Sequence, residues 1–134
     1  MIVVADTNVI LRTVVTDDDE EQTARAMAFL EKADRIIVPV VVFCEVAWCL
    51  RQRYKRKKEF VSAALRAILN SENIETNEEA VSAGLRIAEA GGDFADGVIQ
   101  YVGSVRAGAP SVFVSFDEEA VKLLAERGVA AVSP

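Results

Sequence analysis

The chain has 134 residues, contains no histidine and carries a formal net charge of −6 at pH 7. The length suits one compact domain over residues 1–134, and the lack of histidine excludes imidazole as a general base or a zinc ligand. Any metal would be held by oxygen ligands, which favours Mg²⁺ or Mn²⁺, and the acidic balance argues against broad binding of nucleic acid.

Neither a membrane span nor an export signal is predicted. The longest apolar run, residues 36–44, contains Pro39 and is far shorter than the roughly 20 residues that cross a bilayer. The amino terminus has no basic start before Asp6, so no secretory signal is expected. Cys44 and Cys49 lie five residues apart on one predicted helix, which suits reduced thiols better than a disulfide. We therefore expect a cytoplasmic protein without a membrane partner.

Hydrophobic patterns predict strands that alternate with helices. In chain order, the first half should contain a strand at 2–4, a helix at 7–15, a helix led by the acidic stretch 17–21, a strand at 36–38, and helices at 39–54 and 59–69. The second half should contain an extended segment at Ile74, helices at 78–90 and 94–105, a strand at 111–116, a helix at 118–127 and a strand at 129–132. Pro39 suits the first helical position. This order predicts a three-layer α/β/α fold with a central, mostly parallel sheet.

Asp6 and Asp117 each follow directly after a predicted strand. In open α/β sheets, ligands bind beyond the carboxyl ends of the strands, so both acids are candidates for a common site. Each acid also suits the N-cap of the helix that follows it, and a cap is the simpler interpretation of either one alone. Two such acids at equivalent strand ends favour a metal site.

Glu45 interrupts an apolar helix. Its neighbours three and four residues away are Val41, Val42, Trp48 and Cys49, and no Lys or Arg lies within one helical turn. This spacing predicts a buried apolar face, where a carboxylate needs a counter-ion. We interpret Glu45 as a metal-binding or catalytic residue.

Asp93 and Asp96 open the helix after Gly91 and Gly92. Backbone N–H groups and the helix dipole favour negative charge at that position, so Asp93 is most simply the N-cap. Asp96 is expected to share a face directed at the edge of the core with Ile99, three residues later. Of the two acids, Asp96 is the first choice for a metal ligand.

The run from Arg51 to Lys58 is basic within an acidic chain. It holds six Lys or Arg residues and Tyr54, and it predicts contacts with an RNA backbone. A solvated helix end, where cations suit the helix dipole, is the alternative interpretation. The candidate RNA-binding residues are Arg51, Arg53, Lys55 and Arg56 in the run and Arg12 outside it.

Four segments of the chain resemble the acidic motifs of one family. Val4-Ala5-Asp6-Thr7-Asn8, Phe43-Cys44-Glu45-Val46, Asp93-Phe94-Ala95-Asp96-Gly97-Val98-Ile99 and Val114-Ser115-Phe116-Asp117 look like the four motifs of PIN-domain ribonucleases, with VapC-like toxins of type II toxin–antitoxin systems as the closest match. The order and the spacing of all four motifs suit a short, single-domain member. Gly97 departs from the Ala more often seen after the third acid.

The resemblance implies a PIN fold, dependence on Mg²⁺ or Mn²⁺, endonucleolytic cleavage of RNA, a homodimer and inhibition by a cognate antitoxin. It assigns catalytic and metal-binding roles to Asp6, Glu45, Asp96 and Asp117. Asn8, Ser115 and Asp93 take supporting positions. In this hypothesis Asp6 and Asp96 hold the principal metal, and Glu45 and Asp117 complete the site directly or through water.

Two other classes of protein stay open. A Mg²⁺-dependent phosphoacceptor or phosphatase would also place Asp6 after the first strand. The phosphatase pattern expects a second Asp where this chain has Asn8, and the phosphoacceptor pattern expects a Lys where Ala109 precedes Pro110. A noncatalytic PIN-fold binding module is the third class, but such modules usually lose an acid and none is missing here.

Overall fold

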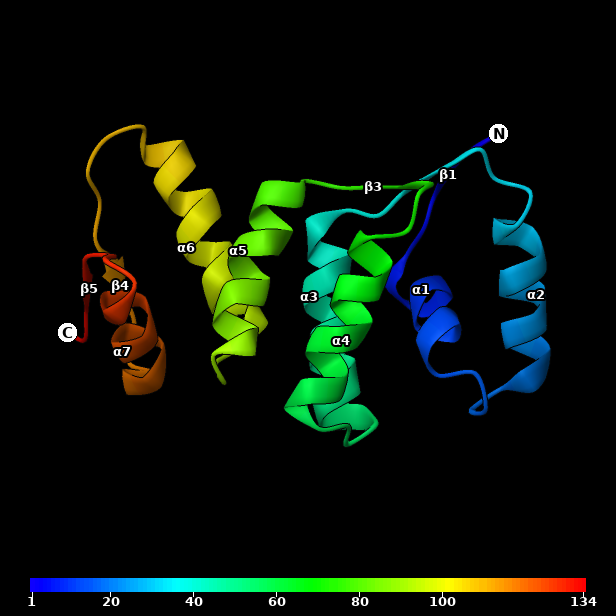
Figure 1. Cartoon of the computed structure of the whole chain (residues 1–134), viewed down its shortest axis with the longest axis horizontal. Coiled ribbons are helices and arrows are strands. Elements are labelled where there is room, and N and C mark those ends of the chain that lie inside the picture. The colour runs from blue at the N-terminus through cyan, green and yellow to red at the C-terminus, as the bar shows by residue number, and fades with distance from the viewer. The chain divides into compact units, whose positions relative to one another are not determined.

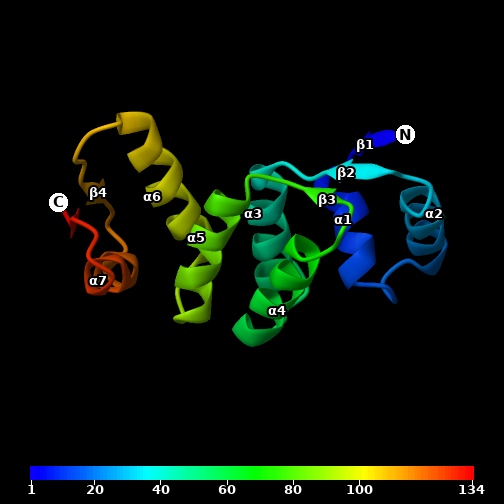
Figure 2. The same cartoon turned by 45° about the horizontal axis from the view of Figure 1, so that its top comes forward.

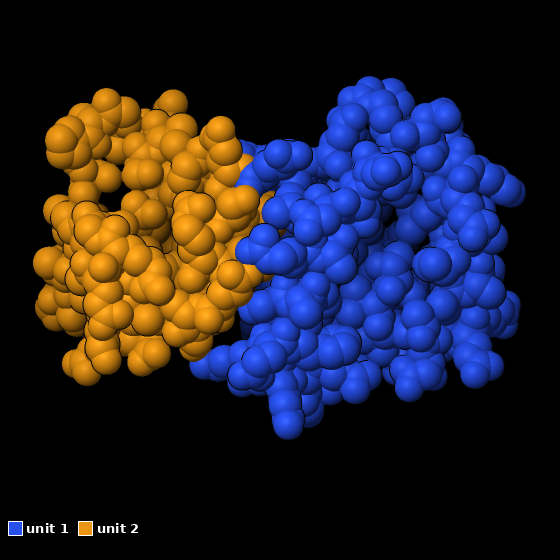
Figure 3. All heavy atoms as spheres, in the orientation of Figure 1, with its two compact units in different colours: residues 1–78 blue, residues 79–134 orange.

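The computed structural model describes residues 1–134, and the chain forms two compact units (Figure 3). Unit 1 contains residues 1–78 and unit 2 contains residues 79–134. A single domain over the whole chain stays a prediction. No helix combines the length and the apolar character that crossing a bilayer requires.

Unit 1 contains a sheet of three parallel strands. They are β1 (Ile2–Val4), β2 (Arg35–Ile37) and β3 (Ile74–Glu75), in the order β1-β2-β3. Val3 pairs with Ile36, which pairs in turn with Ile74. Figure 2 shows the short strands side by side, with the helices of the unit extending from them.

Helices form most of unit 1 (Figure 1). They are α1 (Thr7–Val14), α2 (Glu20–Leu30), α3 (Val40–Trp48), a π-helix at Cys49–Arg53 and α4 (Lys58–Leu69). Apolar side chains from the strands and helices form the core of the unit, and its fully buried members include Ile10, Leu11, Val38, Phe43, Val46, Leu50 and Leu65. No disulfide joins Cys44 and Cys49, as predicted.

Unit 2 combines three helices with two parallel strands. The elements are α5 (Glu78–Glu89), whose first residue belongs to unit 1, α6 (Phe94–Ala107), β4 (Phe113–Val114), α7 (Glu118–Glu126) and β5 (Ala131–Val132). Phe113 pairs with Ala131 in the two-stranded sheet. A small apolar core contains Ile87, Leu123 and Leu124, with Phe113 and Val129 packed against them.

The parallel α/β class is confirmed, and some details of the predicted elements need correction. The strands pair in two sheets, one in each unit. The helix predicted at 39–54 changes to a π-helix at Cys49, and Pro39 is the N-cap of α3 rather than its first residue. The strand predicted at 111–116 forms only at Phe113–Val114, and the strand predicted at 129–132 forms only at Ala131–Val132.

Two glycines allow α5 and α6 to pack closely. A methyl group added at Gly97 would lie 2.5 Å from the carbonyl oxygen of Ala83 and 2.8 Å from the Cα of Gly84. A methyl group at Gly84 would lie 2.6 Å from the ring of Phe94. The Gly97 contacts are with backbone atoms, which cannot move aside as a flexible side chain can. Gly97 therefore sets the distance between the two helices, including the turn that carries Asp96.

We predict that Gly97→Ala lowers the free energy of unfolding. Overpacking costs about 1–3 kcal/mol, which should outweigh the roughly 1 kcal/mol that Ala gains over Gly in a helix. Gly103→Ala is the matched control, since it lies in the same helix with nothing within 4 Å of an added methyl group. Chemical denaturation of both variants should show a loss for Gly97→Ala and a small gain for Gly103→Ala. Equal changes would contradict the packing role of Gly97.

Candidate functional site

Asp6 follows the carboxyl end of β1 and caps α1. The backbone N–H of the preceding residue, Ala5, still donates to the carbonyl oxygen of Ile37 on β2, at 3.0 Å. The Oδ1 atom of Asp6 accepts a hydrogen bond of 3.1 Å from the N–H of Val9, so the N-cap interpretation is confirmed. The cap uses Oδ1 of an exposed carboxylate. A cap and a metal ligand are compatible roles, because the carboxylate has a second oxygen.

Glu45 is tied to the residue after Asp6. The hydroxyl of Thr7 donates a hydrogen bond of 2.9 Å to Oε2 of Glu45. Since Thr7 is the first residue of α1, this bond fixes the Glu45 carboxylate beside the start of the helix that Asp6 caps. Thr7 is not among the residues predicted for the site. Its hydroxyl group, directly after Asp6 in the sequence, could have indicated a supporting role there.

The prediction that Glu45 lies on a buried face is wrong. Glu45 is exposed, and its neighbours Val41 and Trp48 are 60% and 63% exposed. Val42 and Val46 belong to the buried face instead. Every other residue of α3 is apolar, so the spacing of apolar residues does not indicate which side of this helix faces the core.

Asp96 carries the clearest electrostatic signal in unit 2. It is half-buried in the first turn of α6. Burial, followed by the negative charges of Asp93 and Asp117, raises the pKa of Asp96 from its ordinary value of 3.8 to about 6. Its supposed neighbour on the core-directed face, Ile99, is 58% exposed, so that part of the prediction is wrong. Asp96 is therefore half-buried although Ile99, three residues later, is exposed.

Asp93 and Asp117 are both N-caps, as the simpler interpretation predicted. Oδ1 of Asp93 accepts from the N–H of Ala95 at 3.1 Å. Oδ1 of Asp117 accepts from the N–H groups of Glu119 and Ala120 at 3.0 and 3.2 Å. The N–H of Asp117 in turn donates to the hydroxyl of Ser115 at 3.0 Å. Ser115 thus holds the turn that presents Asp117.

Each unit brings some of the predicted acids together. In unit 1, Thr7 hydrogen-bonds to Glu45 and is itself the chain neighbour of Asp6 and of Asn8, which is exposed. In unit 2, Asp93, Asp96 and Asp117 are close enough for two of the charges to raise the pKa of the third. No group of three or more His, Cys, Asp or Glu side chains has the geometry to hold a metal ion. The donor set, all carboxylate oxygen, nevertheless fits a hard cation such as Mg²⁺.

Residues 3–125 match the protein family described as PIN domain. The chain belongs to the PIN domain family. The matched region contains Asp6, Glu45, Asp96 and Asp117. The PIN domain is a nuclease fold, and its members typically use divalent metal ions. No individual curated protein matched the chain.

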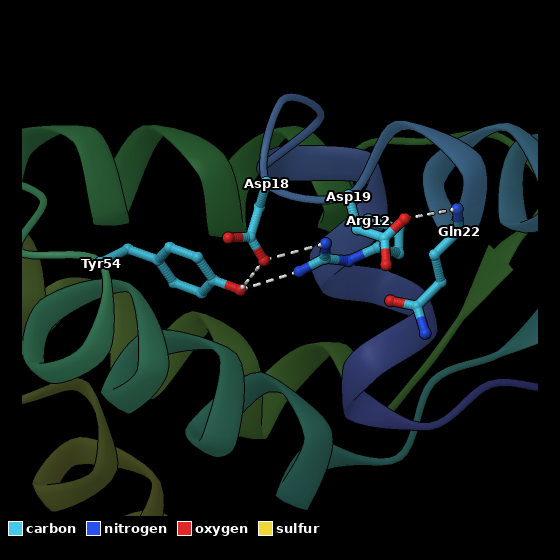
Figure 4. Close-up of polar contacts among 5 residues, drawn as sticks. All are labelled: Arg12, Asp18, Asp19, Gln22 and Tyr54. Carbon is cyan, nitrogen blue, oxygen red and sulfur yellow. Dashed lines mark hydrogen bonds and ion pairs between the residues drawn. The ribbon is translucent and has the colours of Figure 1, made fainter.

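Within this PIN domain, the predicted RNA contact of Arg12 is wrong. It was predicted to contact RNA, but only 2% of it is exposed. Its guanidinium donates to Oδ2 of Asp18 at 3.1 Å and to the hydroxyl of Tyr54 at 2.7 Å, and that hydroxyl donates to the same Asp18 oxygen at 3.0 Å (Figure 4). Arg12 is therefore an internal cation that connects α1 to the end of the π-helix.

The pKa shifts agree with this pairing. Burial alone would lower the pKa of Arg12, but the hydrogen bonds to Asp18 and Tyr54 outweigh burial and the net shift is upward. The hydrogen bonds from Tyr54 and Arg12 lower the pKa of Asp18. Both charged forms are stabilised, so Arg12, Asp18 and Tyr54 form a cluster that persists at neutral pH.

The basic run divides into exposed and internally engaged cations. Arg51, Arg53 and Lys55 are exposed. Arg51 donates to the carbonyl oxygen of Arg56 at 2.8 Å, and Lys55 adopts a positive φ of 55°. Arg56 is half-buried, with its guanidinium 5.4 Å from the centre of the Phe60 ring. RNA binding by these four residues stays a prediction, and Arg56 is the least accessible of them.

The raised pKa of Asp96 predicts how the stability of the metal-free PIN domain depends on pH. The folded state holds a proton that the unfolded chain releases, so this stabilising contribution is present below about pH 4 and is lost as the pH rises through about 6. Asp96→Asn cannot ionise. Both proteins should be measured in chelator at pH 5 and at pH 7. The Tm of Asp96→Asn minus the Tm of the parent should be larger at pH 7 than at pH 5. An equal Tm difference at both pH values would contradict the assignment.

We also predict that Tyr54→Phe destabilises the fold. The change removes the hydroxyl that bonds the buried Arg12, and a hydrogen bond to a charged group contributes about 1.5–3 kcal/mol. Tyr101→Phe is the control, because it removes a hydrogen bond to Glu79 that lies in solvent. Urea denaturation should show a loss for Tyr54→Phe and a change below about 0.5 kcal/mol for Tyr101→Phe. Similar losses in both variants would contradict the bridging role.

Proposed function

We propose that this PIN domain is a Mg²⁺- or Mn²⁺-dependent endoribonuclease and the toxin of a VapC-like toxin–antitoxin pair. The observation that carries the proposal is the half-buried Asp96 beside Asp93 and Asp117, whose pKa is raised first by burial and then by those two negative charges. No cation contributes to that shift, so the carboxylates have only a proton or a metal ion to offset their charge. The family match supports the nuclease class.

Asp6, Glu45, Asp96 and Asp117 would hold the metal in this proposal. Bound divalent metal lowers the pKa of a coordinated water and offsets negative charge on the phosphate oxygens. The protein's part is to fix the ligands. The N-caps of Asp6 and Asp117 each hold a carboxylate oxygen against backbone N–H groups, and Thr7 holds Glu45. Side chains fixed in this way are oriented before substrate binds.

The exposed cations of unit 1 suit the RNA substrate. Arg51, Arg53 and Lys55 are exposed at the end of the helical segment that carries Glu45. They offset phosphate charge in a chain whose net charge is −6, and they localise the RNA contact to one surface. The basic segment is held in place by Tyr54, through its hydrogen bonds to Arg12 and Asp18.

A homodimer and a cognate antitoxin are the protein partners in this proposal, and the cytoplasm is its compartment. Exposed apolar side chains on unit 2 support protein partners, because such surfaces mark interaction sites. A hollow of about 290 Å³ lies between α6 and the segment that contains β4. Its lining includes the exposed residues Ile99, Val112 and Val114, and α6 exposes Val102 and Val105 as well.

The proposal predicts that Asp6→Asn and Asp96→Asn lose RNA cleavage. Mutation of groups that only orient a metal ligand costs about 10–100-fold, so the loss of a ligand should cost about a hundredfold or more. Cleavage of a panel of structured RNAs should be measured with Mg²⁺, with Mn²⁺ and with chelator. Asp17→Asn is the control, since Asp17 is an exposed acid outside the site. Cleavage by folded Asp6→Asn and Asp96→Asn proteins at the parent rate would overturn the proposal.

A further inference from the structure

Trp48 is an exposed aromatic residue next to Glu45. It is the only tryptophan of the chain, and it ends α3 with 63% of its surface exposed. Residues three apart on a helix are neighbours on its surface, so the indole lies on the same side of α3 as the Glu45 carboxylate. Val41, four residues before Glu45, is also exposed. The exposed face of α3 is therefore apolar around a single acid.

The basic run follows Trp48 along the chain. Arg51 follows Trp48 by three residues in the π-helix, and Arg53 and Lys55 come after it. All three cations are exposed. In chain order the exposed side chains are thus a carboxylate, an indole and three cations, the last of which, Lys55, lies just beyond the helix. Single π-turns next to α-helices are rare and frequently lie at functional sites.

This order of side chains suits a nucleotide chain. Cations attract the phosphates, and an aromatic face stacks on a base of any sequence. A protein partner could bind to the exposed apolar residues alone, without the cations that follow Trp48 in the chain. The other aromatic side chain of the segment, Tyr54, hydrogen-bonds to Arg12 and Asp18 and stays with the internal cluster. Trp48 is left as the stacking surface.

We propose that Trp48 is a base-stacking subsite for an unpaired nucleotide of the RNA, next to the phosphate that is cut. The inference rests on the proposed function, because it takes RNA as the ligand and Glu45 as part of the cleavage site. Trp48 positions the substrate and takes no part in the bond-breaking step. It confers a preference for single-stranded RNA, since the bases of a duplex are already stacked on one another.

Tryptophan fluorescence tests the subsite directly, because all of the emission comes from Trp48. A short single-stranded RNA should be titrated into the parent protein in chelator, where no cleavage occurs, and the blunt duplex of the same sequence should be titrated separately. The single strand should quench the emission and shield the indole from acrylamide. The duplex should do neither. Unchanged emission at saturating single strand would overturn the proposal.

Variants give a second readout through the anisotropy of a labelled RNA. Trp48→Ala should weaken binding of the single strand roughly five- to a hundredfold, the range for one stacked base, and Trp48→Phe should keep most of the affinity. Phe29→Ala is the matched control, since it removes another exposed aromatic residue of unit 1 and should leave the affinity unchanged. With metal present, Trp48→Ala should raise KM more than it lowers kcat.

The outcomes separate this inference from the proposed function. Cleavage with metal, together with equal RNA affinity for the parent and Trp48→Ala, would overturn the subsite and leave the nuclease intact. Quenching and weakened binding without cleavage under any metal would support the subsite and overturn the nuclease. If Trp48→Ala changes the molecular mass of the protein in solution but leaves RNA affinity unchanged, the indole faces a protein partner and the proposal fails.

Discussion

The repulsion among Asp93, Asp96 and Asp117 is the constraint on which the account of this site depends. Burial and two neighbouring negative charges raise the pKa of Asp96, and no Lys or Arg lowers it. Two carboxylates 4 Å apart repel by about 4 kcal/mol at an effective dielectric constant of 20, so ionising such a group costs free energy that a bound cation would offset. A PIN domain that binds a divalent metal gives this arrangement a physical reason.

The helix starts give the acids a structural role as well as a chemical one. Asp6, Asp93 and Asp117 each accept backbone N–H groups at the beginning of a helix, which satisfies donors that would otherwise lack partners. Because a cap fixes the side chain, the acid is already oriented towards whatever lies beyond the helix end. Thr7 and Ser115 extend the same principle through hydrogen bonds to Glu45 and from Asp117.

The sequence predicted those features that depend on residues close together in the chain. The parallel strands, the helices and the caps at Asp6, Asp93 and Asp117 follow from hydrophobic period and from Asp at helix starts. The orientation of Glu45 did not follow, because α3 is apolar on all sides and its face is chosen by tertiary packing. Arg12 was misinterpreted for a related reason, since its partner Tyr54 lies 42 residues away. Gly97, which in sequence only weakens a helix, proves to be required by the close approach of α5.

Direct measurement of Mn²⁺ binding tests the central claim, that the acidic side chains of this PIN domain bind a divalent cation. Titration calorimetry and the electron paramagnetic resonance of free Mn²⁺ report binding without any RNA. The account predicts saturable binding to the parent protein and a large loss of affinity in both Asp6→Asn and Asp96→Asn. Parent-like Mn²⁺ affinity in either folded variant would contradict it.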